Sequence, residues 1–402
     1  MKSLLAAGVV VAGISLGGCV APSSDDDLSA DVVEVLPAGS FVAEWSAPLR
    51  LDGAQPVHLE LLGDHVLLTD SVNRAYSLTA GGGTLTFARP IVDEGETLQP
   101  PVLIERTGSA TTAPADDLIA FPSAANIYLI TTGGQSLSAA TLNFAVTGPA
   151  AEANGMLYAG VAASGVAGQV GAIDPLRPYS NIDWRRVVFG QVLASPVVFD
   201  GVVFVPTSVV QGSDRGRVYA ISVDKQTAVW NTALNESYFE TFAGNTVDLV
   251  ADDFGLYVAS DDTQLYVLDR NSGSLRWRFY AGSPLEHPPA VTDDMVYQPV
   301  NGLGLAALDK ASGQIVREPV WSASAAKLFI SEDDKHVYAL GNDGRLLGLD
   351  KNTGAVKFAS DRNDFVDAVV NTDDATIYAV TRDGEVVRAR ANLRPGGTGQ
   401  KL

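Results

Sequence analysis

The sequence predicts an all-β fold: an eight-bladed β-propeller of four-stranded antiparallel sheets, closed by an N-terminal strand. Two markers recur about every 40 residues from residue 40 onward, and the stretches between them alternate apolar and polar residues. No window keeps a helical period. A unit of this length, divided into four short strands, cannot bury both faces of its sheet alone. Eight units packed side by side therefore close into a ring, which leaves few open sheet edges.

The first marker is a turn that begins with aspartate, carries a glycine and is followed in several copies by an aromatic residue. Its clearest copies are LDRNSGSLRW at Asp269, LDKASGQIV at Asp309 and LDKNTGAVKF at Asp350, and a less regular copy is VDKQTAVW at Asp224. From Asp224 to Asp350 the successive spacings are 45, 40 and 41 residues. Weaker copies lie upstream at Asp174, Thr131 and Thr79. We expect Asp269 to cap a tight turn, Gly273 to supply its backbone angles and Trp277 to pack against the neighbouring sheet.

The second marker is a tight polar turn between two strands, and it also occurs eight times. Its copies are Gly63-Asp64, Asp116-Asp117, Asn154-Gly155, Asp200-Gly201, Asp252-Asp253, Asp293-Asp294, Asp333-Asp334 and Asp373-Asp374. In the last four units this hairpin precedes the aspartate-turn position by 17, 16, 17 and 17 residues. Two markers that keep a constant phase indicate one repeated structural unit.

The two ends of the repeat array predict how the ring closes. FVAEW, from Phe41 to Trp45, is an aromatic strand with no turn before it, and the last repeat runs out at Leu402 without a clear aromatic strand. We expect Phe41 to Trp45 to supply the outer strand of the last sheet. Removing it should open the propeller.

The N-terminus predicts a lipid anchor. Lys2 precedes an apolar stretch from Leu4 to Leu16, and LGGC puts small residues directly before Cys19. This resembles a bacterial lipoprotein signal, which implies cleavage before Cys19 and attachment of fatty acyl chains such as palmitate. The alternative is a membrane-spanning helix, but about thirteen apolar residues are too few for the roughly twenty that a span needs.

These features divide the chain into four segments. The expected segments are a signal peptide (1–18), a lipidated cysteine with a flexible tether (19–39), the propeller (40–395) and a C-terminal tail (396–402). Val20 after the cysteine resembles the sorting pattern of outer-membrane lipoproteins. We therefore expect an outer-membrane protein whose propeller faces the periplasm and is a single ring within a larger complex.

Composition excludes several classes of function. The formal net charge of -20 would repel a phosphate backbone, so nucleic acid is not expected as a partner. Cys19 is the only cysteine, so the mature fold has no internal disulfide, no cysteine-based metal site and no thiol nucleophile. The four histidines lack metal-ligand spacing. We predict no catalytic residues, no metal and no cofactor.

The aspartate-turn repeat resembles the quinoprotein-type, or PQQ-like, propeller repeat, which enzymes and non-enzymes share. The resemblance to the enzymes would imply pyrroloquinoline quinone, calcium, a catalytic aspartate and commonly an adjacent cysteine pair. This chain has no cysteine pair and no haem-attachment motif. These two absences argue against an enzyme, so a PQQ-dependent oxidoreductase is only the second alternative.

Long insertions indicate where a partner binds, because repeat proteins usually carry such sites on the face that receives them. We expect the insertions at Ala88 to Ala115, Thr207 to Arg217 and Asn231 to Thr246 to lie on the face opposite the marker turns. The candidate contact residues are Arg185, Arg186, Phe189, Tyr238, Phe239 and Asp248. The alternative is that these are variable loops without a partner.

The lipoprotein signal, the tether and the repeats together resemble the BamB family of outer-membrane lipoproteins. That resemblance implies a non-enzymatic scaffold that binds periplasmic domains of the barrel-assembly subunit BamA. It also implies an arginine in one inter-sheet link and paired aspartates in the next. Asp248 matches one acidic position, Thr246 stands at the other, and Arg185 and Arg186 come early in the link. The first alternative is a PQQ-like propeller lipoprotein that binds another envelope protein or a glycan.

Overall fold

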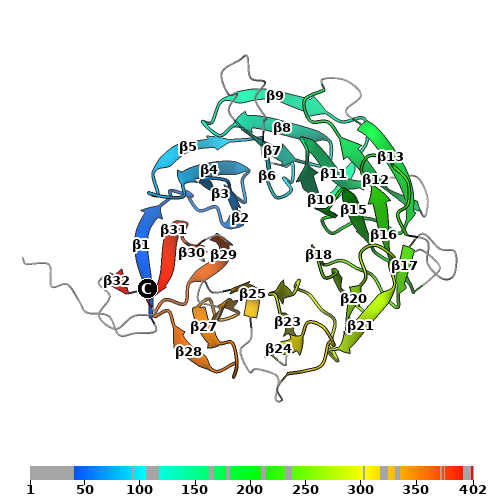
Figure 1. The fold of residues 1–402 in the computed structure, drawn as a ribbon. Helices are drawn as coiled ribbons and strands as arrows, with labels where there is room; N and C mark the ends of the chain where they lie inside the picture. Colours follow the sequence, from blue (N-terminus) through cyan, green and yellow to red (C-terminus); the bar gives the residue numbers. More distant parts are fainter. Residues whose placement is uncertain are drawn as a thin grey trace, which may run out of the picture.

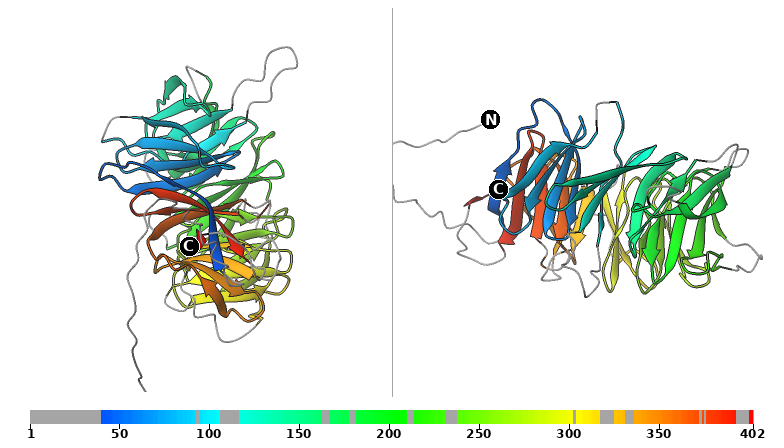
Figure 2. Two further views of the ribbon diagram at one scale, coloured as in Figure 1. Left: turned by 90° about the vertical axis from the view of Figure 1, so that its left-hand side faces the viewer. Right: turned by 90° about the horizontal axis from the view of Figure 1, so that it is seen from above.

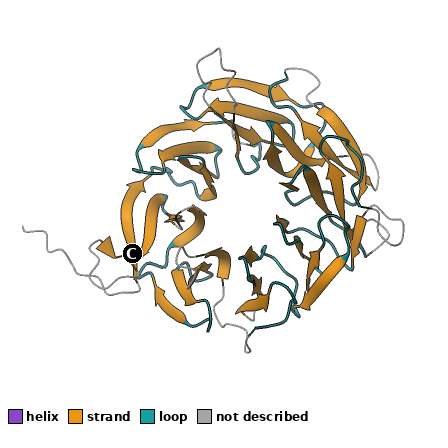
Figure 3. Cartoon of the chain, viewed as in Figure 1, coloured by secondary structure: helices purple, strands orange, loops and turns teal. Residues whose placement is uncertain are grey.

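The computed structural model confirms the predicted fold (Figure 1). All regular structure in the described residues is β-strand (Figure 3). The structure describes residues 40–92, 95–105, 117–162, 167–177, 182–209, 214–230, 238–301, 304–316, 325–330, 336–371, 374, 376–392 and 400–401. Within this part of the chain no helix is long and apolar enough to cross a membrane.

The strands form eight sheets, the blades, and seven of these follow the chain in order. Blade 1 consists of β2 (Pro56–Leu62), β3 (His65–Asp70), β4 (Arg74–Thr79) and β5 (Leu85–Pro90), and blade 2 of β6 (Val102–Ile104), β7 (Leu118–Pro122), β8 (Asn126–Thr131) and β9 (Ser136–Thr141). Blade 3 consists of β10 (Val146–Ala153), β11 (Met156–Val161), β12 (Ala167–Ile173) and β13 (Ile182–Phe189), and blade 4 of β14 (Val197–Phe199), β15 (Val202–Thr207), β16 (Gly216–Ser222) and β17 (Tyr238–Thr241).

The second half of the ring repeats the pattern. Blade 5 consists of β18 (Val250–Ala251), β19 (Leu256–Ala259), β20 (Gln264–Leu268) and β21 (Leu275–Tyr280), and blade 6 of β22 (Ala290–Val291), β23 (Met295–Val300) and β24 (Gly304–Asp309). Blade 7 consists of β25 (Ala325–Ile330), β26 (His336–Gly341), β27 (Leu346–Asp350) and β28 (Val356–Ala359), and blade 8 of β29 (Phe365–Asn371), β30 (Thr376–Thr381), β31 (Glu385–Asn392), β1 (Ser40–Pro48) and β32 (Gln400–Lys401).

The polar hairpins predicted from the second marker form where they are described. Leu62 pairs with His65, Ala153 with Met156, and Phe199 with Val202, so each turn has two residues. Asn154 and Asp200 take positive φ angles of 56° and 49°, as such turns require. The copies at 116, 333–334 and 373 lie outside the described residues.

The core is divided among the gaps between blades. Eight clusters of buried apolar side chains each draw residues from two neighbouring blades. The second strands are buried along almost their whole length, and β7 is buried at every position. Burying one Val or Leu side chain contributes about 1.5–3 kcal/mol, so each gap is held mainly by apolar packing. Seen edge-on, the blades form a flattened ring (Figure 2).

Blade 8 closes the ring with the N-terminal strand, as predicted. β1 pairs with β31 from Ser40↔Asn392 to Pro48↔Glu385, and the two lie side by side in Figures 1 and 2. Phe41 is fully buried, with its ring centroid 5.1 Å from that of Phe358 in blade 7. The structure adds a short C-terminal strand that the sequence did not predict, because β32 pairs with the outer edge of β1.

The aspartate turn has the predicted roles. The Asp269 carboxylate accepts hydrogen bonds from the Ser272 amide and hydroxyl, both at 2.9 Å. Gly273 has φ 71°, and its amide donates to the Asp269 carbonyl at 2.8 Å. Trp277 is 8% exposed, and its Nε1 donates to the Lys310 carbonyl in the turn of the next blade at 2.8 Å. The motif therefore caps its own turn and packs against the next copy. Trp321, which follows a later copy, lies outside the described residues.

Candidate functional site

The antiparallel order of each blade separates two faces of the ring. The motif face carries the hairpins between first and second strands together with the aspartate turns. The link face carries the hairpins between second and third strands together with the links from one blade to the next. Contacts on the motif face agree with this division, because Lys310 of an aspartate turn reaches the hairpin carboxylate of Asp252 at 2.8 Å.

Two of the three predicted insertions need correction. Ala88 to Ala115 is not one link: β5 ends at Pro90, the link spans residues 91–101, and β6 follows within the predicted range. Asn231 to Thr246 is also not one link, because β17 lies within it and pairs with β16. The cause of both errors is a short strand without strong alternation inside a long irregular stretch. Thr207 to Arg217 does connect β15 to β16, on the link face.

Exposed apolar side chains gather on the link face at blades 3 to 5. They come from the end of β13, the following link, the hairpin after β15 and the link after β17. Their exposed fractions are 47% for Phe189, 39% for Leu193, 44% for Val209 and 52% for Phe242. Hydrogen bonds join the segments laterally: the Ser208 amide donates to the Gln191 carbonyl at 2.8 Å. Exposed apolar side chains that lie together on a monomer are typical of an interaction site.

Arginine side chains order the outer part of this surface. The Arg217 guanidinium lies 4.1 Å from the centroid of the Tyr238 ring and 5.1 Å from that of Phe189. Arg215 lies 4.3 Å from the centroid of Phe242, and both arginines face the Glu240 carboxylate. Cation–π contacts and the Glu240 carboxylate therefore join these side chains into one cluster.

Asp248 lies at the inner part of the surface, in the link that leads to β18. Its Oδ1 accepts a hydrogen bond from the Ser195 amide in the preceding link at 2.7 Å. Desolvation by the surrounding protein raises the pKa of the Asp248 carboxyl, and the Ser195 hydrogen bond opposes this. The structure therefore pairs Asp248 with the segment around Leu193 and Ser195.

A second carboxylate lies beside the position where the sequence has Thr246. The Thr246 hydroxyl donates to Asp261 Oδ1 at 2.9 Å, and Asp261 belongs to the hairpin between β19 and β20. Desolvation also raises the pKa of Asp261. A hairpin of the same blade thus places a carboxylate beside Thr246, where the sequence itself has no acidic residue. We name Phe189, Leu193, Val209, Arg215, Arg217, Tyr238, Phe242, Asp248 and Asp261 together the link patch.

The predicted contact residues divide into two groups. Phe189, Tyr238 and Asp248 belong to the link patch. Arg185 and Arg186 lie exposed on β13, the outermost strand of blade 3, whereas Asp248 precedes the innermost strand of blade 5. Phe239 is half-buried, with its ring centroid 5.4 Å from that of Tyr266, so it packs between blades 4 and 5. Cys19 lies outside the described residues.

Sequence reasoning missed Leu193, Val209, Arg215, Arg217, Phe242 and Asp261 as contact residues. Leu193 and Phe242 are large apolar residues in links between strands, and that was a usable signal. Nothing in the sequence showed that Asp261 would lie beside Thr246, because a hairpin and a link separated by 15 residues meet only in the folded blade. Within the residues described, no group of three or more His, Cys, Asp or Glu side chains is placed to hold a metal ion.

Comparison with known proteins agrees with the propeller fold. A family model described as outer membrane protein assembly factor BamB matches residues 214–331. The outer membrane protein assembly factor BamB of Yersinia pestis is 27% identical over 212 residues, which are 47% of this chain and 52% of that protein. The chain thus matches about half the length of this curated relative.

Solved structures extend the likeness to the whole ring. BamB from Moraxella catarrhalis has a TM-score of 0.63 at 14% identity, over 87% of this chain and 97% of that one. A computationally designed protein, Ika8, has a TM-score of 0.61 at 14% identity, over 89% of this chain and 99% of that one. At this identity the structures show the fold alone. Together with the family model and the curated relative, the ring identifies the chain as a BamB-like propeller of the PQQ type.

Proposed function

We propose that this protein is a non-enzymatic, lipid-anchored scaffold that assists the assembly of outer-membrane β-barrel proteins. It binds a periplasmic domain of the assembly machine, such as that of a BamA-like subunit, through the link patch. The observation that carries the proposal is this ordered, partly apolar surface on a ring whose relatives are named as assembly factors.

The composition of the link patch suits protein recognition. Aromatic and arginine side chains are enriched at the centres of protein interfaces, and here Arg217 and Tyr238 already stack on each other. Two carboxylates, Asp248 and Asp261, lie at the inner part, and desolvation raises the pKa of each. A basic partner residue that reached either carboxylate would form a hydrogen-bonded ion pair.

Affinity capture from envelopes tests the partner. The protein with a C-terminal affinity tag is captured from detergent-solubilised envelopes of its own bacterium, alongside a variant with Phe242→Ser and Leu193→Ser. We expect the barrel-assembly subunits to copurify with the parent chain and at least about fivefold less with the variant. Equal recovery would contradict the use of the link patch, and no recovery with either chain would contradict the assembly role.

Fractionation tests the anchor separately. We expect the parent chain in the outer membrane, and Cys19→Ala in the soluble periplasmic fraction or retained with its signal peptide uncleaved. Mass spectrometry of the mature N-terminal peptide should show acyl chains on Cys19. An unmodified Cys19 in a membrane-bound chain would contradict the lipoprotein assignment.

A further inference from the structure

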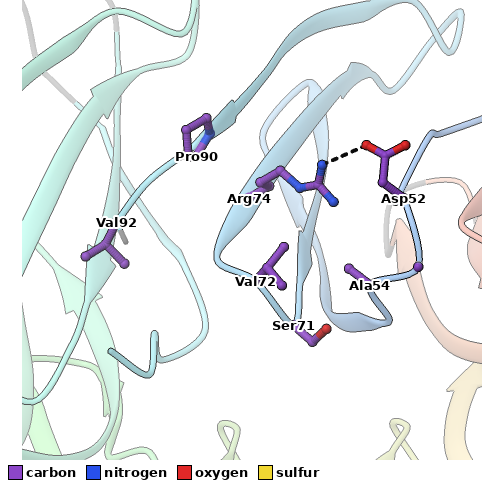
Figure 4. Close-up of a pocket in the computed structure, with 8 residues that line it drawn as sticks. Asp52, Ala54, Ser71, Val72, Arg74, Pro90 and Val92 are labelled. Atoms are coloured by element: carbon purple, nitrogen blue, oxygen red, sulfur yellow. Dashed lines mark hydrogen bonds and ion pairs between the residues drawn. The ribbon is translucent and has the colours of Figure 1, made fainter. Parts of the chain in front are cut away.

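A cavity on the link face of blade 1 lies across the ring from the link patch (Figure 1). Its volume is about 550 Å³, within the range of about 300–1,000 Å³ of small-molecule sites. The walls come from the link between β1 and β2, the hairpin between β3 and β4, and the link after β5. The lining residues are Asp52, Gly53, Ala54, Ser71, Val72, Arg74, Pro90 and Val92 (Figure 4).

The polar end of the cavity has an excess of negative charge. Arg74 donates three hydrogen bonds: its Nε to Asp70 at 2.9 Å, its Nη1 to Asp52 at 3.0 Å, and its Nη2 to the Leu51 carbonyl. Two carboxylates therefore face one guanidinium. Asp70 is fully buried, and its carboxylate also accepts the amides of Val72 and Arg74. The side chain of Asp52 is 72% exposed and keeps an oxygen for another donor.

The neighbouring Tyr76 adds no charge to this network. The Tyr76 hydroxyl donates to Asp70 at 3.1 Å, and burial together with the Asp70 charge raises the pKa of Tyr76 to about 12, so the phenol stays neutral. The Ser71 hydroxyl oxygen accepts the Gln55 amide at 3.1 Å and has a second lone pair. The cavity thus presents acceptors at one end.

The other walls are aliphatic. Val72, Pro90 and Val92 lie across the space from the Asp52 carboxylate, and Ala54 lies beside Asp52 (Figure 4). A cavity with aliphatic residues on one wall and a carboxylate on the other matches a lysine or arginine side chain, whose methylene stem packs on apolar surface while its charged head reaches a polar group. An acidic or phosphate group would meet the Asp52 carboxylate, and Arg74 is already paired with two carboxylates.

We propose that this cavity binds a lysine or arginine side chain carried on an extended segment of a partner protein. The ammonium or guanidinium pairs with Asp52 and donates to Ser71, and the stem lies against Val72, Pro90 and Val92. The proposal is independent of the assembly role, because a basic side chain can be tested alone. It gives the link face a second contact point, far from the link patch.

Amide chemical shifts of isotope-labelled protein test this proposal with Nα-acetyl-lysine N-methylamide as the probe. We expect saturable shifts at the amides of Gly53, Ser71 and Val72, and none with the norleucine or glutamate analogues, which lack the cationic head. Asp52→Asn should weaken binding at least about threefold. Asn tolerates the positive φ of 52° at this position, so the variant should fold.

Asp253→Asn is the matched control, because its side chain is 95% exposed on the motif face. We expect it to leave the affinity for the lysine probe unchanged. The proposal is overturned if norleucine binds as well as lysine, if the glutamate analogue binds, if Asp52→Asn and Asp253→Asn behave alike, or if no saturable shift occurs at these amides.

Discussion

One aromatic residue from the motif face and one from the link face of this ring show opposite degrees of burial. On the motif face, Trp277 is 8% exposed and packs onto the turn of the next blade. On the link face, Phe242 is 52% exposed, and the guanidinium of Arg215 lies 4.3 Å from the centroid of its ring. The difference teaches that the regular repeat buries its aromatic residue between blades, whereas an irregular connection leaves one exposed, at the place where we propose that a partner binds.

Contacts between blades explain why the two sequence markers stay in phase. The basic residue after each clear turn aspartate pairs with a hairpin carboxylate of the preceding blade: Arg270 with Asp200 at 3.0 Å, Lys310 with Asp252 at 2.8 Å and Lys351 with Asp294 at 3.2 Å. The hairpin and the turn therefore touch, and a change in their spacing would break the contact. On the link face the repeated contact is a hydrogen bond within a blade, from the amide of Ser71, Ser208 or Asp261 to the carbonyl of Gln55, Gln191 or Gly244, respectively.

The largest expected effect compares one aromatic residue from each face. Trp277→Ala removes a buried ring and should lower the free energy of unfolding by about 3–5 kcal/mol. Phe242→Ala removes an exposed ring and should change it by less than about 0.5 kcal/mol. Urea unfolding measures both changes in free energy, with circular dichroism as the signal because it does not depend on tryptophan. A costly Phe242→Ala or a harmless Trp277→Ala would remove the distinction between the faces.

Two glycines allow the cost of backbone strain to be measured separately from the cost of close packing. Gly273 and Gly282 have similar φ angles of 71° and 83°, but a Cβ on Gly273 would lie 2.6 Å from Trp230, whereas one on Gly282 would meet nothing within 4 Å. We expect Gly282→Ala to cost about 1 kcal/mol from strain. Gly273→Ala should cost about 2–4 kcal/mol, because overpacking adds to strain.

The same unfolding assay measures these two variants. Equal losses of stability would show that the turn needs glycine only for its backbone angles. That result would contradict the packing of each aromatic residue onto the glycine of the next copy.

The capped aspartates predict a dependence on pH. Desolvation would raise the pKa of Asp269, but hydrogen bonds from Ser272 and the charge of Arg276 outweigh it and hold this pKa below its ordinary value. A lowered folded-state pKa contributes stability above the ordinary aspartate pKa and loses it as pH falls through the folded value. Stability should therefore be flat from about pH 7 to pH 5 and fall below about pH 4.

Asp269→Ala tests this assignment. It should cost about 1 kcal/mol at pH 7 and show a shallower loss of stability towards low pH than the parent chain. Unfolding midpoints in urea across this pH range measure the effect. A parallel pH profile would show that Asp269 does not contribute to the acid dependence.

The smallest effect concerns the ion pairs between blades. Lys310 is 13% exposed at its side chain and pairs with Asp252, whereas Lys357 is 50% exposed and lies 3.5 Å from Asp350. We expect Lys310→Met to cost about 0.5–1 kcal/mol and Lys357→Met almost nothing. Added salt should reduce the first difference. Equal values would show that the repeated pairs follow from the fold without stabilising it.

The sequence predicted the ring well, because its markers are local. The turn needs Asp, Gly and a following aromatic residue at fixed spacing. Each requirement can therefore be recognised from a single residue of the local sequence, such as Gly273. Weak copies kept the chemistry in altered form: at Thr79 and Thr131 the hydroxyl oxygen accepts the amide of Thr84 at 3.1 Å or of Gln135 at 3.0 Å. Threonine thus stands in place of the capping aspartate in blades 1 and 2.

The link patch was only partly predictable, because it forms between segments that are distant in sequence. Ser195 and Asp248 are 53 residues apart, and only the ring brings the two links together. Arg185 and Arg186 were expected at this place because they precede the link, but the pairing of β13 with β12 extends to Phe189 and places both arginines on the outer strand. No turn residue marks the approach to the end of β13, so the sequence did not show where this strand ends.

Site-specific photocrosslinking in intact cells tests the central claim most directly. A photoreactive phenylalanine replaces Phe242 on the link face in one chain and the exposed Asn271 on the motif face in another. The account predicts a crosslink from position 242 to a subunit of the barrel-assembly machine, and none from position 271. A crosslink to that subunit from position 271 alone, or from both positions with equal yield, would contradict the division of the ring into a structural face and a binding face.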